Sequence, residues 1–522
     1  MFNPRISIAS RYNAGGTTRS TVATISAPIG GWNARDPVSE MPPTDAYVLD
    51  NFIPGLQGVV QRQGVTTHAT GVTGNFIETL MEYSAGSGAA KLFAADPSKI
   101  YNVTASGAVG AAELSSLSNG RWQHLMFSTA GGNFLVCCNG ADSVRNYDGT
   151  TWTTPAITGV TSSTLINVAA HAQRLWFVQS GTLKIWYLPV LSIAGAATSI
   201  DFASICRLGG ELVAMATWTR DGGAGMDDSA VFVTSKGEIL IYQGTDPSSV
   251  TTWSLVGIFK GPPPIGKRCF IKLGADLCYL SVQGVLPLPP FLNQNSAGRA
   301  ALAITNKISG AFQDAYVNYG TNYGWQVIEY PKKSLLIVNI PVVERATQHQ
   351  YVMNLQNGSW CRFKNIQANC MALSGDYLYF GGSDGKTYKY ATSENDYDDD
   401  GEPINSLSIH AFNSFGSVAR KSFKMARPLF IGPSSYIPQV TLLTDYSTNL
   451  PEFSPTSYDS LGALWGTFLW GTRTWSSGLR ARSIWRAITG NGVTAAAVVA
   501  ANTTRKLTYN AIDIMFETGG PL

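Results

Sequence analysis

The chain has 522 residues, of which 14% are charged, 11% are aromatic and 53 are glycine, and its net charge is +3. This length exceeds what a single small core requires, and so small a net charge excludes any argument for nucleic-acid binding from charge alone. Few charges with many glycines and aromatics are typical of short strands joined by tight turns, so we expect a mainly β protein.

The charge is unevenly distributed along the chain. Residues 405–522 carry ten basic and five acidic side chains, a surplus of +5, whereas the preceding residues sum to −2. The seven cysteines form no spacing pattern, and most lie in apolar strand-like runs, which predicts buried reduced thiols and folding in a reducing cytoplasm. The N-terminus lacks the apolar core of a signal peptide, and the longest apolar run, residues 495–501, is shorter than the ~20 residues of a membrane span.

Residues 1–30 are rich in Ser, Thr and Gly and predict a flexible or partner-docked arm. Residues 31–64 form a strap that prolines and glycines interrupt throughout. Pro37, Pro42 and Pro43 lie within seven positions and exclude both a regular helix and a central strand, because each proline removes a backbone donor. We expect an extended strap anchored by its large apolar side chains.

From about residue 91 a strand–turn–strand pattern repeats at intervals of roughly 40 to 60 residues, a spacing typical of propeller blades. Asn-Gly and Asp-Gly pairs supply the positive φ that hairpin turns need. No helix-period segment of convincing length interrupts the series, so we predict a β-propeller of six or seven blades. The repeating segments are 91–103, 134–152, 174–188, 230–244, 277–288, 334–360 and 377–391.

An acidic loop, residues 393–403, ends the propeller. Beyond it, residues 406–412, 439–446 and 506–516 predict strands of a separate β-rich module. An aromatic insert at 464–475 lies between these strands. We interpret its three tryptophans as core or interface residues, with an aromatic cage for a sugar or nucleotide as the alternative; they are Trp465, Trp470 and Trp475.

Two glycine motifs suggest catalysis but lack its requirements. GPPPIGKR (261–268) has the lysine spacing of a phosphate loop, but three prolines delete the backbone donors and Arg268 replaces the hydroxyl that would hold magnesium. Ser383 lies in a Gly-x-Ser-x-Gly pattern, yet a strand follows it where a nucleophile elbow needs a helix. We expect no catalytic residue at either place.

The acidic loop resembles half of a calcium site. Asp396, Asp398, Asp400 and Gly401 match the first half of a calcium loop, but Leu407 stands where the bidentate glutamate belongs. A solvated loop is our interpretation, with incidental calcium binding left open. The five histidines share neither metal-ligand nor catalytic spacing, so we predict no metal, no cofactor and no enzyme activity.

Basic residues accumulate in two segments of the C-terminal module, 419–428 and 480–486. They either protect a solvated sheet edge or contact phosphate or a neighbouring subunit. The candidates for a DNA channel or a subunit interface are Arg420, Lys421, Lys424, Arg427, Arg480, Arg482 and Arg486.

The strap, followed by the blade series, resembles the N-terminal signature of the tail nozzle proteins of short-tailed bacteriophages. These are also called tail tubular protein B and are related to packaged-DNA stabilisation proteins. Residues 416–430 and 513–520 are similar to the platform module of that family. The matching strap residues are Gly31, Trp32, Asn33, Arg35, Asp36, Met41, Pro42, Pro43, Asp45, Ala46, Leu49, Asp50, Asn51, Phe52, Val60, Arg62 and Gly64.

The resemblance implies a structural virion protein of the phage tail, assembled in the host cytoplasm as a hexameric ring below the portal and adaptor. Its channel would retain the double-stranded DNA genome and conduct it, independent of sequence, during ejection; tail fibre or spike proteins would be further partners. The platform would be built from both ends of the chain. We expect Trp32, Leu49 and Phe52 to be buried there, with Arg35 and Asp36 paired.

This reading divides the chain into an arm (1–30), a strap and platform part (31–90), a propeller (91–391) and a C-terminal platform module with the aromatic insert (392–522). The alternative function is a receptor-binding, glycan-binding or sialidase-like propeller, suggested by YDGTTW (147–152) and SDGKTY (383–388). The first of these lacks one residue of the sialidase hairpin motif. A cellular propeller scaffold is a third and weaker possibility.

Overall fold

The structure is a computed structural model that describes residues 20–519 except for 74–75, 87–89, 222–225, 250, 293–297, 299–300, 433–437 and 450–479. It divides into two compact units. The terminal unit comprises Met1–Thr66, Gln350–Lys364 and Tyr390–Leu522, and the propeller unit comprises Thr67–His349 and Asn365–Lys389. The first propeller strand starts at Thr79, so the propeller begins earlier than the expected residue 91.

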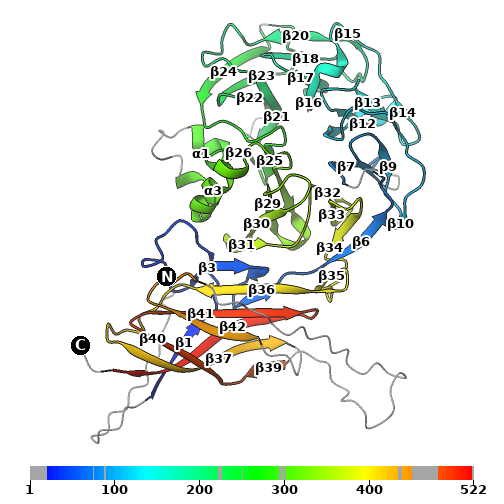
Figure 1. The fold of residues 1–522 in the computed structure, drawn as a ribbon. Coiled ribbons are helices and arrows are strands. Elements are labelled where there is room, and N and C mark those ends of the chain that lie inside the picture. The colour runs from blue at the N-terminus through cyan, green and yellow to red at the C-terminus, as the bar shows by residue number, and fades with distance from the viewer. Residues whose placement is uncertain are drawn as a thin grey trace, which may run out of the picture. The chain divides into compact units, whose positions relative to one another are not determined.

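The propeller unit contains five separate antiparallel sheets that follow one another along the chain, as Figure 1 shows. The first is β7 (Thr79–Tyr83), β8 (Lys91–Ala95) and β9 (Ile100–Asn102), and the second is β11 (Gln123–Thr129), β12 (Gly132–Cys138), β13 (Arg145–Tyr147) and β14 (Trp152–Thr153). The third is β16 (Leu165–His171), β17 (Arg174–Gln179), β18 (Lys184–Tyr187) and β20 (Thr198–Asp201). The fourth is β21 (Leu212–Asp221), β22 (Met226–Thr234), β23 (Glu238–Gly244) and β24 (Trp253–Lys260), and the fifth is β25 (Phe270–Leu273), β26 (Asp276–Ser281) and β27 (Gly284–Pro287).

Two further antiparallel ladders complete the ring. They are β28 (Gln326–Tyr330) with β29 (Leu335–Pro341), and β32 (Cys370–Ser374), β33 (Tyr377–Gly381) and β34 (Thr387–Tyr390). The first strands contact one another in the order β11, β16, β21, β25, β28, β32 and β7, and β7 contacts β12 of the second blade. The predicted β-propeller is confirmed: five separate sheets are its blades, and the two further ladders, which belong to a larger sheet, follow them around the unit.

Turn chemistry and apolar strands explain why the blades form. The Asp-Gly pair at 384–385 lies in the β33–β34 turn, where Gly385 has a φ of +73° that a side chain would disfavour. Between neighbouring blades, apolar side chains from facing strands form clusters; one joins Met81, Phe93, Trp122 and Tyr147 of the first two blades. The burial of such clusters is the main stabilising force of the unit.

Short elements connect the blades. One of them is a helix that the sequence did not predict: α3 (Ser309–Tyr319) buries only Phe312 and Ala315, with Phe312 against Trp325, so its apolar period is weak. None of the described helices is long and apolar enough to cross a membrane. The other connecting elements are α1 (Leu288–Leu292), the 3-10 helices η1 (Ser162–Thr164), η2 (Ile304–Ile308) and η3 (Pro331–Lys333), and the strands β10 (Gly107–Ala108), β15 (Ile157–Thr158) and β19 (Gly195–Ala196).

The terminal unit is built from two groups of strands that both combine N-terminal and C-terminal segments. The first contains β1 (Ser20–Ser26), β4 (Phe52–Pro54), β5 (Val59–Gln61), β37 (Lys421–Gly432), β39 (Arg480–Ser483), β40 (Arg486–Gly492) and β42 (Thr508–Thr518). The second contains β2 (Gly31–Trp32), β3 (Asp45–Asp50), β31 (Ser359–Phe363), β35 (Asp398–Asp399), β36 (Glu402–His410), β38 (Gln439–Thr444) and β41 (Ala495–Thr503). The strands β6 (Val65–Thr70) and β30 (Gln348–Asn354) cross the boundary between the units.

The predicted C-terminal strands are confirmed as β36, β38 and β42. The apolar run 495–501 is buried throughout and forms most of β41, which pairs with β36 on one side and β38 on the other. Strand β3 of the strap pairs with β36, and β1 pairs with β42 along its whole length. The two ends of the chain thus share one β-rich unit, as the sequence predicted.

Candidate functional site

The apolar side chains of the strap are anchors within the terminal unit. Trp32 is buried and packs edge-on against Tyr351, with ring centroids 4.9 Å apart, and Leu49 and Phe52 are fully buried. Arg35 and Asp36 form an ion pair at 2.7 Å on the surface. A surface pair of this kind contributes little to stability. The buried residues, and not the ion pair, hold the strap.

Polar residues of the strap fix its turns. The side-chain amide of Asn33 donates to Asp36 at 2.9 Å and to Asp45 at 2.8 Å, while its carbonyl accepts the backbone N–H groups of Arg35 and Asp36. A buried amide with all its groups engaged defines one local geometry. This explains why asparagine suits the Gly-Trp-Asn-x-Arg-Asp sequence.

Arg62 is the most completely engaged polar side chain of the strap. It is fully buried, and its five N–H donors are all used: Nε donates to Asn51, Nη1 and Nη2 donate to the two carboxylate oxygens of Asp399, and the remaining donors reach the carbonyl oxygens of Gln63 and Lys364. Arginine is the side chain with this number of donors in a planar fork. Arg62 therefore ties the strap to the acidic loop and to the 359–364 segment of the same unit.

Glycine is required at two positions of the strap because the backbone of another segment lies too close for a Cβ atom. A Cβ atom at Gly64 would lie 1.7 Å from the carbonyl oxygen of Asp398. Gly31 has a φ of +86°, and a Cβ atom there would lie 2.6 Å from the carbonyl oxygen of Trp360. Every side chain is excluded at both positions unless the backbone moves.

The basic candidates whose side chains the structure describes do not share one surface. Lys421 is buried, and its ammonium donates to the carbonyl oxygens of Ser417, Ala419 and Val493 at 2.6–3.0 Å. Burial lowers the pKa of Lys421. It is therefore occupied inside the unit and is not available to DNA or to a second subunit, contrary to the expectation from sequence.

Arg427 is also engaged internally. Its guanidinium contacts the buried Asp513 at 2.5–2.8 Å and lies over the ring of Trp485. Arg486 pairs in register with Ala426, the neighbour of Arg427 on β37. Successive residues of a strand point to opposite faces, so Arg427 and Arg486 lie on opposite faces of the sheet.

The remaining candidates keep some exposure. Arg420 and Arg486 are exposed, Arg482 is half-buried, and Lys424 makes an exposed contact of 3.6 Å with Glu517. The side chain of Arg480 and the tryptophans Trp465, Trp470 and Trp475 lie outside the described residues, as does most of the N-terminal arm.

The carboxylates of the acidic loop, which resembles half of a calcium site, are engaged by other groups of the protein. Asp396 accepts from Thr392, Asp398 accepts from the backbone N–H of Gly401, and Asp399 pairs with Arg62, so these carboxylates point to separate partners. No group of three His, Cys, Asp or Glu residues in the described chain is placed to hold a metal ion.

Ser383 and Asp148 are turn residues. Ser383 lies in the β33–β34 turn, as predicted. Asp148 accepts the backbone N–H groups of Thr150 and Thr151 at 2.7 Å in the turn between β13 and β14, and these bonds hold its pKa below the usual range. Its carboxylate thus stabilises the hairpin turn. All seven cysteines are free, and all except the half-buried Cys206 are buried.

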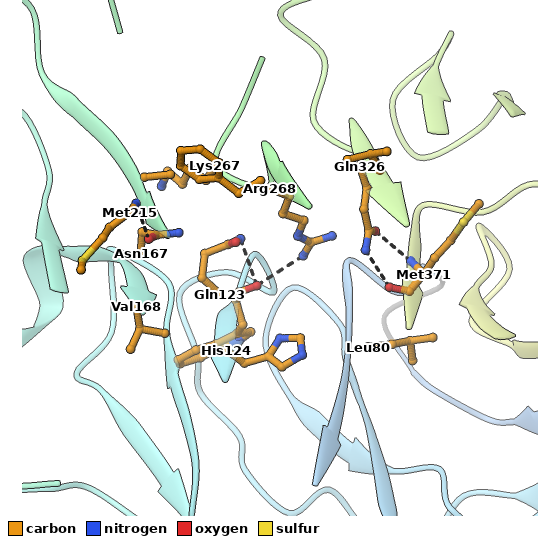
Figure 2. Close-up of a pocket in the computed structure, with 14 residues that line it drawn as sticks. Leu80, Gln123, His124, Asn167, Val168, Met215, Lys267, Arg268, Gln326 and Met371 are labelled. Atoms are coloured by element: carbon orange, nitrogen blue, oxygen red, sulfur yellow. Dashed lines mark hydrogen bonds between the residues drawn. The ribbon is translucent and has the colours of Figure 1, made fainter. Parts of the chain in front are cut away.

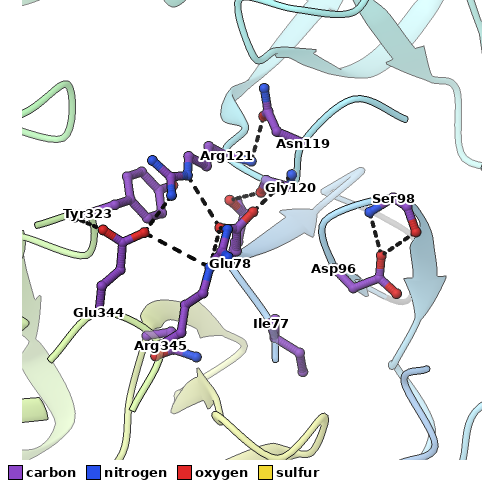
Figure 3. Close-up of polar contacts among 12 residues, drawn as sticks. Ile77, Glu78, Asp96, Ser98, Asn119, Gly120, Arg121, Tyr323, Glu344 and Arg345 are labelled. Atoms are coloured by element: carbon purple, nitrogen blue, oxygen red, sulfur yellow. Dashed lines mark hydrogen bonds and ion pairs between the residues drawn. The ribbon is translucent and has the colours of Figure 1, made fainter. Parts of the chain in front are cut away.

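A polar network in the propeller unit centres on Glu78, which is almost completely buried (Figure 3). Its carboxylate accepts from Arg345 at 2.7 Å, from Arg121 at 3.3 Å and from the backbone N–H of Gly120 at 3.0 Å. Arg121 also reaches Glu344 at 2.6 Å. The network joins segments that precede β7 and β11 to the loop after β29, so it links three blades.

A cavity of about 250 Å³ lies on the axis of the propeller unit. All seven first strands contribute to its wall, through residues that include Leu80 of β7, His124 of β11, Asn167 of β16, Met215 of β21 and Gln326 of β28. Figure 2 shows these residues around the cavity. Lys267 and Arg268, from the loop before β25, complete the polar part of the wall. Its concave wall and convergent polar groups make this cavity a candidate ligand site.

Comparison with known proteins adds no function. No model of a protein family matches the sequence, and no curated protein matches it. Among solved structures, BBS1N in complex with ARL6DN is 11% identical with a TM-score of 0.39 and covers 64% of this chain and 97% of its own. The extracellular domain of BT4673 from B. thetaiotaomicron is 12% identical (TM-score 0.41; 74% of this chain, 56% of its own), and the designed Ika8 protein is 10% identical (TM-score 0.33; 65% and 98%).

Sequence reasoning missed the Arg62–Asp399 pair and the axial cavity. Arg62 was part of the strap signature, but no spacing connects it to an aspartate more than three hundred residues away. In the sequence, Lys267 and Arg268 belong to a segment that matches only the spacing of a phosphate loop. Their position directly before a blade's first strand was the signal that could have placed them near the axis.

Proposed function

We propose that this chain is a structural, non-enzymatic virion protein of a short phage tail, a nozzle-type subunit that forms a hexameric ring below the portal and adaptor. The proposal depends on one observation about the strap. The residues by which the chain resembles the tail nozzle family are the ones that fix the strap within the terminal unit, among them Trp32, Asn33, Phe52, Arg62 and Gly64.

The combination of units supports the same proposal. The strap pairs through β5 with β42, one of the C-terminal strands that also resemble the family, and a propeller is inserted between these two parts of the chain. A short sequence match by chance would not carry this connectivity with it. In this proposal the strap holds the terminal unit together and does not contact DNA.

Double-stranded DNA is the cargo in this proposal, and its contact with the channel requires only sparse positive charge. Phosphate attraction is independent of sequence and falls with salt. Arg420, Lys424, Arg482 and Arg486 are the candidates that retain exposure. Lys421 and Arg427 serve the fold of the terminal unit instead.

Electron microscopy of particles that contain this chain tests the proposal directly. We expect six copies around the tail axis, directly below the adaptor, with the terminal units forming the ring. A particle in which the chain is absent from the tail, or is present as single copies on fibres, contradicts the proposal. The mass of the purified protein, measured by light scattering with and without adaptor, distinguishes a ring former from a persistent monomer.

The alternative of a glycan-binding or sialidase-like propeller is tested separately. The turn bonds of Asp148 account for the YDGTTW sequence without any ligand. A glycan array probed with the full chain at micromolar concentration is expected to show no binding above a denatured control. Specific binding or glycan hydrolysis would favour the alternative over the nozzle role.

A further inference from the structure

The wall of the axial cavity has an unbalanced charge. It contains two cations, Lys267 and Arg268, and a histidine, but no aspartate or glutamate. The guanidinium of Arg268 donates to Thr79 at 2.7 Å and lies over the ring of Tyr323, so neutral groups hold it in place. Its charge is therefore oriented but not neutralised at hydrogen-bond distance within the described chain.

Lys267 is the less satisfied of the two cations. Among the described residues, no hydrogen bond or ion pair engages its ammonium, and Glu211 influences it only through longer-range attraction. Burial lowers the pKa of Lys267. A half-buried ammonium without a partner is unfavourable, and an anion in contact with it would relieve this cost.

Neutral donors lie beside the two cations (Figure 2). The carbonyl oxygen of Asn167 accepts the backbone N–H of Met215 at 3.2 Å, which leaves the amide nitrogen of Asn167 as a donor. Burial and the nearby Arg268 lower the pKa of His124 to about 4, so its ring is neutral at pH 7 and carries one N–H donor. In contrast, both polar atoms of the Gln326 amide are hydrogen-bonded to the backbone of Met371.

We propose that the axial cavity of the propeller unit binds a small oxyanion with at least two negatively charged oxygens, a phosphate or a short dicarboxylate, with the ammonium of Lys267 as its main contact. Arg268 provides a second positive charge, and Asn167 and His124 provide hydrogen bonds. The cavity holds the volume of about eight waters at ~30 Å³ each, which suits an anion of about ten heavy atoms or fewer. The inference is independent of the proposed role in a phage tail.

The site differs from the phosphate loop that GPPPIGKR resembles. A phosphate loop binds through consecutive backbone N–H groups, three of which prolines remove here. In this cavity the same segment presents side chains instead, from Lys267 and Arg268. The lysine of the motif therefore acts in a site built by several blades.

Isothermal calorimetry of the full chain with inorganic phosphate and, separately, with malonate tests the proposal; acetate is the singly charged comparison. We expect saturable binding of phosphate or malonate that exceeds binding of acetate at least tenfold. Lys267→Met removes the charge but keeps the length of the side chain. It should weaken binding about tenfold to hundredfold, the effect of losing a charged hydrogen bond.

The matched control is Lys272→Met, because Lys272 is an exposed lysine of β25 that does not line the cavity. It should change the affinity less than twofold, with circular dichroism confirming that both variants are folded. No binding of phosphate or malonate at 10 mM, or equal losses in the two variants, overturns the proposal. If one of the two anions binds more tightly, that preference shows whether the site recognises phosphates or dicarboxylates.

Discussion

At the scale of single residues, the strap depends on a few groups that are buried and fully bonded. Arg62 has no exposed surface and uses all five donors, whereas Arg35, in the same strap, is about half exposed beside Asp36. The two arginines belong to the same sequence signature but have different energetic roles. The two arginines differ in burial and in the number of hydrogen bonds, and neither property can be seen in the sequence.

Replacement of Arg62 by lysine is therefore expected to destabilise the terminal unit by roughly 3 kcal/mol, because the half-buried Asp399 loses its two-point partner and the groups that the buried guanidinium engages lose their donors. Chemical denaturation followed by circular dichroism measures the change. Arg35→Lys is the matched control and should cost less than about 1 kcal/mol. Equal effects of the two substitutions would show that the Arg62–Asp399 pair adds nothing to stability.

At the scale of elements, blades are joined by apolar clusters and, at one place, by buried charge. Glu78 and Glu344 each pair with both Arg121 and Arg345, and Glu78 is the buried acid of the two. The two arginines come from different blades, and without the Glu78 carboxylate only the half-buried Glu344 would offset their mutual repulsion. The network thus connects the beginning of the propeller to its β28–β29 blade.

We predict that Glu78→Gln lowers the free energy of unfolding of the propeller unit by about 1–3 kcal/mol, the cost of removing a buried charged acceptor. Because both arginines are about 40% exposed, solvent screening keeps the effect below that of a fully buried pair. Thermal unfolding by calorimetry is the measurement. Glu113→Gln, at an exposed site of the same unit, should shift the midpoint by less than one degree; a shift as large as that of Glu78→Gln would refute the role of the network.

The elements of the fold were largely predictable, and the contacts between them were not. Short apolar strands and Asp-Gly turns such as 384–385 carry local signals, and they predicted the blades and the strands β36, β38 and β42. Helix α3 was missed because only two of its residues are buried. The burial of Lys421 and the convergence of Lys267 and Arg268 on the propeller axis depend on long-range packing, which no local pattern encodes.

At the scale of the whole molecule, the chain passes between its two units four times, near residues 66, 349, 364 and 389. The terminal unit is therefore discontinuous in sequence. Strand β42 pairs with β1 and β5 from the first segment, and β36 pairs with β3. Without residues 20–66, the long strands β42 and β36 each present unpaired backbone groups, which favour aggregation.

We accordingly expect residues 390–522 to fail to fold alone, although they supply most strands of the terminal unit. Joining residues 20–66 to this fragment restores the partners of β36 and β42 and should recover strand content in far-ultraviolet circular dichroism, with a midpoint below that of the full chain because β31 is still missing. If the 390–522 fragment unfolds cooperatively as a soluble monomer, the strap is dispensable for this unit. The strap would then be an addition to a complete fold and could not be its fastener, and the structural support for the proposed nozzle role would be lost with it.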